Sequence, residues 1–167
     1  MRHANASADG RENALKGELA GEILRRFGTL RLQVTGQSML PSVWPGDVLL
    51  IKRCFFGELS PGDIVLYARE RRLFAHRVIG AGAGLDEPYL VTQGDASPTP
   101  DSPISAAEFL GRVSQIVRAG KCLEPAPVLS FPNRLVANIA RYSTILARLF
   151  VYRHVTRGNC GKREALC

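Results

Sequence analysis

The sequence lacks any apolar run long enough to cross a membrane. A spanning helix needs roughly 18 or more consecutive apolar residues, and the 167 residues contain no such run. Residues 1–13 are polar and have no apolar core of the kind found in secretory signals, so we expect them to form a disordered tail. With neither a spanning helix nor a cleavable signal peptide, we expect a cytoplasmic protein or one held peripherally at a membrane.

Residues that bind metals and nucleotides are also scarce. The four cysteines are scattered, without a C-x-x-C or histidine-flanked pattern: Cys54, Cys122, Cys160 and Cys167. This spacing argues against a zinc site and against a disulfide framework, so we expect reduced thiols. The glycine-rich stretch 80–87 lacks the spacing of a phosphate-binding loop and is not followed by a helical pattern. We therefore predict no metal and no other cofactor.

Acidic residues are outnumbered by basic ones, 15 to 22, which gives a net charge of +7. Such a charge attracts phospholipid headgroups or nucleic acid. Before residue 36, however, the helical spacing of apolar residues supports a single short helix, from Leu15 to Phe27, ended by Gly28. A helix-turn-helix domain needs more helices than this, so we expect no nucleic-acid partner.

From Thr29 onward the apolar period changes from helical to strand-like. Short β-type runs follow at 48–51, 64–67, 73–79, 89–92 and 110–117. The tripeptide Pro-Gly-Asp occurs twice between them, at 45–47 and 61–63, and is typical of turns. Many short strands with turn signals predict a mainly β fold, either a barrel or a coiled sheet.

The last third of the chain differs in character. We expect a β domain with its leading helix over 14–120, a proline-containing linker over 121–132, and an amphipathic helix with a basic tail over 133–167. In that helix, arginines recur every seven residues beside an apolar stripe. Such a helix can contact an anionic membrane, here through 133–157, or dock on its own domain or a partner. The pattern favours neither.

One stretch carries candidate chemistry, namely Gly36-Gln37-Ser38-Met39-Leu40-Pro41, followed by Gly46-Asp47. A serine on a bent, glycine-relieved backbone can present its Oγ to an extended substrate. A loop serine that only caps a turn is the alternative. Two further stretches follow in order, Gly62-Asp63-Ile64-Val65 leading to Ala75-His76-Arg77-Val78-Ile79, then Thr92-Gln93-Gly94-Asp95 with Pro100-Asp101.

These three stretches, spread over residues 29 to 118, resemble the sequence boxes of type I signal peptidases and of the wider family that includes self-cleaving repressors. The resemblance implies a coiled β-barrel catalytic core and a serine endopeptidase activity. It also implies Ser38 as the nucleophile. Signal peptidases are normally anchored by an N-terminal membrane helix, which this sequence does not show.

A serine nucleophile needs a base within hydrogen-bond reach. His76 lies in a β-type run 38 residues after Ser38. Its context resembles the His-Arg-Val-Ile of the endoplasmic-reticulum and archaeal peptidases, in which histidine replaces the bacterial lysine, and this implies a Ser-His-acid arrangement. Lys52 is a rival base, although its position at a strand end favours solvent.

For the acid there are two candidates. The resemblance places Asp101 as the carboxylate that orients His76 and Asp95 as a loop-fixing residue, although exchanged roles are also compatible with the sequence. The backbone N–H of Ser38 is the implied oxyanion donor, with Gly36 or Gln37 helping. We expect Met39 and Leu40 to line an apolar substrate groove, and strand edges to bind the peptide by β-augmentation.

Three functions are compatible with these residues. The first and preferred one is a signal-peptidase-type serine endopeptidase that cleaves precursor proteins near a membrane. The second is a cytosolic self-processing or precursor-maturing protease of the repressor branch. The third is a non-catalytic peptide-binding relative, which the presence of Ser38, His76, Asp95 and Asp101 disfavours.

Overall fold

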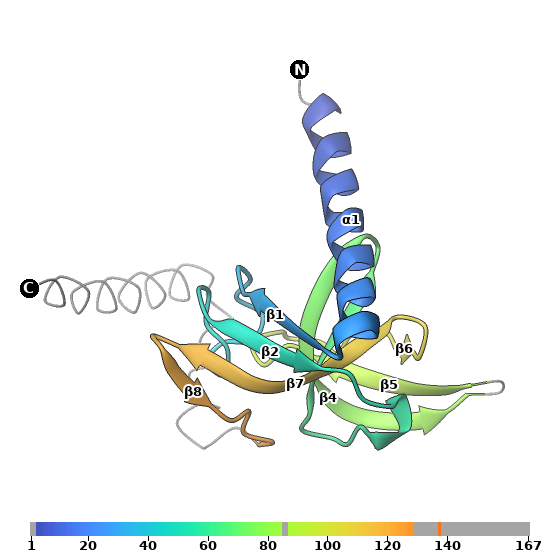
Figure 1. The fold of residues 1–167 in the computed structure, drawn as a ribbon. Coiled ribbons are helices and arrows are strands. Elements are labelled where there is room, and N and C mark those ends of the chain that lie inside the picture. The colour runs from blue at the N-terminus through green and yellow to red at the C-terminus, as the bar shows by residue number, and fades with distance from the viewer. Residues whose placement is uncertain (1–2, 85–86, 129–136, 138–167) are drawn as a thin grey trace, which may run out of the picture.

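A computed structural model of the protein describes residues 3–84, 87–128 and 137. In chain order the elements are α1 (His3–Phe27), β1 (Thr29–Gln33), β2 (Val48–Lys52), the short 3₁₀ helix η1 (Phe56–Glu58), β3 (Ile64–Arg69), β4 (Arg72–Ala83), β5 (Pro88–Gln93), β6 (Ile104–Ser105), β7 (Phe109–Arg118) and β8 (Lys121–Leu123). Figure 1 shows them as one sheet with α1 rising from it. The mainly β character predicted from the sequence is confirmed.

The eight strands form one antiparallel sheet in the order β1-β2-β7-β3-β4-β5-β6, and β8 pairs with β7. The sheet does not close into a barrel, so that expectation is corrected. Closure requires matched strands at the two ends of the sheet, whereas β6 has only two residues and β1 only five. Within the described residues, β1 pairs only with β2, and the part of β4 from 72 to 76 pairs only with β3.

Helix α1 is longer than the apolar pattern indicated. It begins at His3, so residues 3–13 belong to the helix and not to the tail that we expected. Several alanines and no proline occur in this stretch, which removes any signal to stop the helix. The helix ends as predicted at Gly28, whose φ of 71° favours glycine and whose N–H bonds to Leu24.

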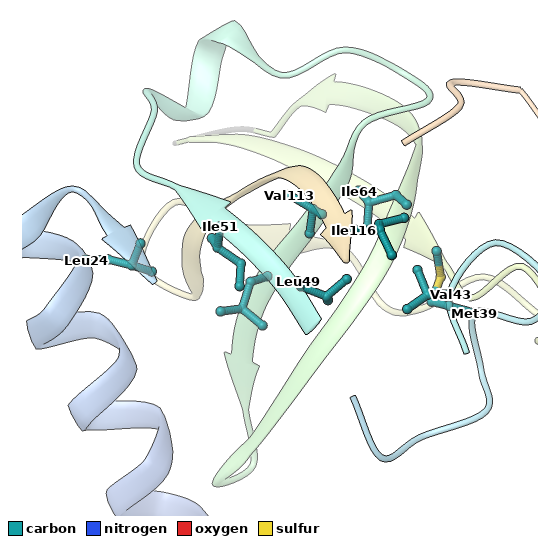
Figure 2. Close-up of a cluster of buried hydrophobic side chains, with 9 residues drawn as sticks. Leu24, Met39, Val43, Leu49, Ile51, Ile64, Val113 and Ile116 are labelled. Carbon is teal, nitrogen blue, oxygen red and sulfur yellow. The ribbon is translucent and has the colours of Figure 1, made fainter. Parts of the chain in front are cut away.

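Two apolar clusters lie on opposite faces of β3. One contains Leu24, Met39, Val43, Leu49, Ile51, Ile64, Leu66, Val113 and Ile116, and the other Leu59, Val65, Tyr67, Val78, Leu90 and Ile104. Strand alternation explains the division, because successive residues of β3 point to opposite faces. Figure 2 shows Leu24 of α1 at one end of the first cluster, and Met39 and Val43 of the β1–β2 loop at the other. This loop is therefore anchored in the core.

Both Pro-Gly-Asp turns form where the sequence predicted them. Gly46 and Gly62 have φ values of 94° and 104°, a region that side chains disfavour. In each turn the aspartate side chain accepts a backbone N–H, Asp47 from Trp44 and Asp63 from Ser60. These bonds fix the loop before β2 and the loop before β3.

The sequence also led to expectations about membrane-spanning helices, cysteines, metal sites and a C-terminal helix, and the described residues bear on some of these. None of the helices in the described ranges combines the length and apolar character needed to cross a bilayer. Cys54 and Cys122 are free thiols, and no metal-binding group of side chains occurs among residues 3–84, 87–128 and 137. Cys160 and Cys167 lie outside the described residues. So do all residues but 137 of the predicted helix and basic tail over 133–167, including its predicted membrane contact through 133–157.

Candidate active site

Ser38 lies in the loop that joins β1 to β2. The base of this loop is closed by two backbone hydrogen bonds, from Val34 N–H to Asp47 and from Gly46 N–H to Val34, each 2.8 Å. Met39, immediately after Ser38, is buried in the first core cluster, whereas Ser38 itself is exposed. The hydroxyl is thus presented to solvent from a loop whose neighbouring side chain is fixed in the core.

The His76 side chain of β4 lies between Ser38 and Asp101. Its Nε2 is 2.9 Å from the Ser38 Oγ, and its Nδ1 is 2.7 Å from the Asp101 Oδ2. An ionised carboxylate can only accept hydrogen bonds, so the imidazole places its proton on Nδ1 and leaves Nε2 free to accept the serine O–H. His76 is only 5% exposed, so the surrounding packing fixes the orientation of its ring.

Asp101 is held by residues of β5 and β3. The Thr92 hydroxyl donates to its Oδ2, and the Asp101 N–H donates to the Thr92 carbonyl, both at 2.8 Å. Arg69 donates to the backbone carbonyls of Ser102 and Pro103, which follow Asp101, and its guanidinium pairs with Glu108. That guanidinium lowers the pKa of the Glu108 carboxyl below its usual value. The loop carrying Asp101 is therefore fixed on both sides.

Tyr67 of β3 completes the surroundings of the imidazole. Its hydroxyl lies 3.4 Å from His76 Nδ1, and the two rings meet edge to face with centroids 6.1 Å apart. Burial raises the pKa of the Tyr67 phenol to about 12, so the hydroxyl stays neutral at ordinary pH. Phe74 stacks on Tyr67 and also touches the imidazole.

Asp95 points to a different partner. Arg77 donates from Nε and Nη2 to its two carboxylate oxygens, each at 2.9 Å, and the Ser42 hydroxyl also contacts it. The same guanidinium reaches the carbonyls of Gly62 and Ala126 at 2.8 and 2.7 Å. Asp95 thus fixes the loop, as the sequence suggested, and Asp101, not Asp95, contacts His76.

The loop after β5 packs directly against the serine. Ala96 N–H donates to the Ser38 carbonyl at 2.8 Å. A Cβ placed on Gly94 would lie 2.6 Å from that carbonyl oxygen and 3.1 Å from the Ser38 Cβ. Because backbone atoms cannot move aside as a flexible side chain can, only glycine fits at this position.

A cavity of about 580 Å³ opens in front of these groups. Its lining includes Gly36, Gln37, Ser38 and Met39, together with residues 32–35 and 72–76. Among the four substrate-contacting residues expected from sequence, only Leu40 does not line it. Leu40 is buried instead against Trp44.

The backbone around Ser38 offers a site for a carbonyl oxygen. No acceptor among the described residues takes a hydrogen bond from the N–H of Ser38, Gln37 or Gly36. Lys52, the rival base, is exposed at the end of β2 and does not line the cavity. The described geometry therefore pairs Ser38 with an imidazole and leaves donors nearby for a developing oxyanion.

Sequence reasoning did not identify several residues of the site, among them Tyr67, Thr92 and the partners of Asp95. Tyr67 lies near His76 only because β3 pairs with β4, in a register that places Val65 opposite His76. Comparisons of the chain with family models, curated proteins and solved structures found no match. Function is therefore inferred from the residues and their geometry.

Proposed function

We propose that the protein is a serine endopeptidase in which Ser38 is the nucleophile, His76 the general base and Asp101 the residue that orients the base. The observation that carries the proposal is the continuous chain of contacts from the Ser38 Oγ through the imidazole to the Asp101 carboxylate. A neutral serine is a poor nucleophile, and an imidazole at hydrogen-bond distance supplies the activation that it needs.

The reaction proceeds in two stages. Nε2 of His76 takes the Ser38 proton as Oγ attacks the peptide carbonyl, and the N–H groups of Ser38 and its neighbours donate to the oxyanion. The imidazolium then gives its proton to the leaving amine, which departs as the acyl-enzyme forms. A water molecule, deprotonated by the same nitrogen, releases the acyl group and restores the serine. Asp101 stabilises the imidazolium throughout.

An extended peptide fits the cavity in front of Ser38. Among the strands that the structure describes, β1 and residues 72–76 of β4 each have one edge without a partner strand, and both segments line this cavity. These edges offer backbone groups to a substrate strand. Buried apolar side chains, including Met39, Val43 and Leu66, line the cavity beneath. This surface suits small apolar residues near the scissile bond.

The three sequence boxes extend the proposal to a signal-peptidase type of enzyme acting on precursor proteins at a membrane surface. A cytosolic maturation protease is the alternative within the same chemistry. Vesicle flotation of the full chain and of a chain ending at residue 132 separates the two. Equal behaviour of both chains on anionic vesicles contradicts attachment through 133–157.

Labelling with a fluorophosphonate tests the chemistry itself, because this reagent phosphonylates a serine only when a base activates it. We expect the wild-type protein to be labelled and Ser38→Ala to stay unlabelled. Ser60→Ala is the matched control, since Ser60 is an exposed loop serine away from the cavity, and it should be labelled normally. Undiminished labelling of Ser38→Ala excludes Ser38 as the nucleophile, and an unlabelled wild type favours a peptide-binding protein without catalysis.

A further inference from the structure

The phenol of Tyr67 reaches the imidazole of His76 from a place that the cavity does not touch. In the register of β3 with β4, Tyr67 stands two residues along from Val65, the direct partner of His76. Residues on this diagonal share one face of the sheet and are within reach of aromatic side chains. Tyr67 is only 2% exposed and does not line the cavity. A peptide bound in the cavity therefore meets the imidazole and not the phenol.

Packing alone does not explain the hydroxyl of Tyr67. The ring stacks on Phe74, with centroids 5.4 Å apart, and belongs to the second apolar cluster. A phenylalanine would fill the same space without burying a polar group, and such burial costs free energy unless the group forms a hydrogen bond. The hydroxyl therefore needs an acceptor in this part of the fold.

The acceptor is the carboxylate of Asp101. The Tyr67 hydroxyl lies 3.4 Å from His76 Nδ1, but this nitrogen directs its own proton to Asp101 Oδ2, 2.7 Å away, and so has no lone pair to offer. Burial is the main cause that raises the pKa of Tyr67, and the charge of Asp101 and a hydrogen bond to it raise this pKa further. The neutral phenol has one proton to donate, and the carboxylate can only accept.

Three donors from three strands then converge on one carboxylate. The Thr92 hydroxyl of β5 donates to Asp101 Oδ2 at 2.8 Å, the imidazole of β4 donates from Nδ1, and the phenol of β3 is the third donor. The side chain of Asp101 is 22% exposed, so water competes for its oxygens. Donors from the protein hold a carboxylate in its ionised form and fix its direction.

We propose that Tyr67 is a positioning residue of the serine peptidase, and that its hydroxyl holds the Asp101 carboxylate against His76 Nδ1. The inference rests on the proposed peptidase function and adds to it a residue of β3 that lines no part of the cavity. Its effect on the reaction passes through Asp101. A fixed carboxylate keeps the imidazole proton on Nδ1, so Nε2 stays free to accept the Ser38 proton.

Loss of this hydroxyl should slow the reaction much less than loss of the carboxylate. In Tyr67→Phe the ring and its packing remain, and Thr92 still donates to Asp101. One hydrogen bond to a charged group is lost, at a distance from the reacting atoms. This loss corresponds to a rate about tenfold lower.

Proton NMR of the full-length chain detects the contact between His76 and Asp101 directly. An imidazole N–H that donates to a carboxylate gives a resonance far downfield of the amide protons, and its absence from Asp101→Asn assigns it to His76. In Tyr67→Phe this resonance should move from its wild-type position and exchange faster with water. Tyr89→Phe removes the hydroxyl of a tyrosine outside the cavity lining and should leave the resonance unchanged.

Two NMR results contradict the proposal. If Tyr67→Phe keeps the wild-type position and exchange rate of the resonance, Tyr67 only packs against its neighbours. If the wild type has no such resonance, His76 does not donate to Asp101 and there is no contact for Tyr67 to support.

Rates of fluorophosphonate labelling connect this network to the proposed chemistry. Tyr67→Phe should be labelled about tenfold more slowly than the wild type, and Tyr89→Phe at the wild-type rate. Equal rates in the wild type and Tyr67→Phe overturn the role of Tyr67 and leave the peptidase proposal standing. A wild type that is not labelled contradicts the peptidase proposal, and the role of Tyr67 in the reaction then falls with it. Slower labelling together with a shifted resonance in Tyr67→Phe supports both.

Discussion

His76 and Arg77 are neighbours on β4, yet they serve two different environments. His76 lies beside an exposed serine at a cavity, with Asp101 behind it. Arg77 points to the other face of the strand and binds Asp95, and both members of this pair are nearly inaccessible, 7% and 6% exposed. Strand alternation separates the two by a single residue.

The two faces of β4 differ in how completely their acidic groups are bound by other side chains. Asp95 receives two N–H bonds from one guanidinium and a hydroxyl contact from Ser42, so both of its oxygens are engaged in fixing loops. On the other face, the chain of contacts ends at the Ser38 hydroxyl, which faces the cavity. The two carboxylates, six positions apart in one loop, thus have different partners: Asp95 binds a buried guanidinium and Asp101 the imidazole.

Replacing Asp101, the carboxylate that contacts His76, should have the largest effect on the proposed peptide hydrolysis. In Asp101→Asn the amide can donate to Nδ1, which favours the wrong imidazole tautomer, so peptide hydrolysis should fall by about 10³ to 10⁴-fold. The free energy of unfolding should change little in comparison. Rates of fluorophosphonate labelling and urea unfolding curves measure the two quantities. Near-normal labelling of Asp101→Asn would contradict the role given to this carboxylate.

Breaking the ion pair between Arg77 and Asp95 should mainly lower the stability of the fold. Arg77→Met removes the guanidinium from a buried carboxylate and should lower the free energy of unfolding by about 3–5 kcal/mol. Arg77→Met combined with Asp95→Leu should recover part of this loss, because no buried charge remains. Arg31→Met, at an exposed position of β1, is the control. A small loss in the single variant would mean that the pair contributes little.

Gly94 joins the two environments, since its loop carries Asp95 and packs on Ser38. In Gly94→Ala the added Cβ would lie 2.6 Å from the Ser38 carbonyl oxygen, so the backbone of the serine must shift to make room. We expect hydrolysis to fall by about 10 to 100-fold, because such displacements disturb the attack geometry. Gly80→Ala, whose Cβ would meet nothing within 4 Å, should retain activity. Equal activity in both would show that Ser38 tolerates the shift.

The smallest expected effect is the contribution of Tyr67 to the pH dependence of the free energy of unfolding. Its folded-state pKa of about 12 exceeds the ordinary value of 10, so the folded protein holds the phenol proton more tightly than the unfolded chain. The stabilisation is complete below pH 10 and is lost between pH 10 and pH 12. This loss is about 2 kcal/mol.

Urea unfolding at pH 8 and pH 11.5 measures this loss. Tyr67→Phe removes the titrating group, so its stability should fall less than that of the wild type over this range. Tyr89→Phe, a tyrosine of β5 that is not fully buried, serves as the control and should behave like the wild type. The same alkaline loss in wild type and Tyr67→Phe would assign it to other groups.

The sequence predicts the components of the site better than their supports. Ser38, His76 and Asp101 stand in stretches with recognisable spacing, and the structure brings these three together. Thr92, Tyr67 and Arg77 became identifiable only when strand register placed them beside the acids and the imidazole. Register depends on pairing between distant segments, which no local pattern encodes.

The fold shows a similar division. Local alternation and the Pro-Gly-Asp turns predicted β2, β3, β5 and β7 to within two residues at each end. They missed the last four residues of β4, the short strand β6, and β8, which occupies the first three residues of the predicted linker 121–132. Closure of the sheet depends on whether β1 and β6 meet, and these strands are separated by about seventy residues of sequence. The early start of α1 was also missed, because an apolar pattern marks the buried side of a helix and not its full length.

The proposed reactive groups lie far apart in sequence, at positions 38, 76 and 101, and they meet only when β4 has paired with β3 and the loop after β5 has folded back on Ser38. In a chain still in synthesis, Ser38 therefore has neither the imidazole nor the carboxylate beside it until more than one hundred residues have been made.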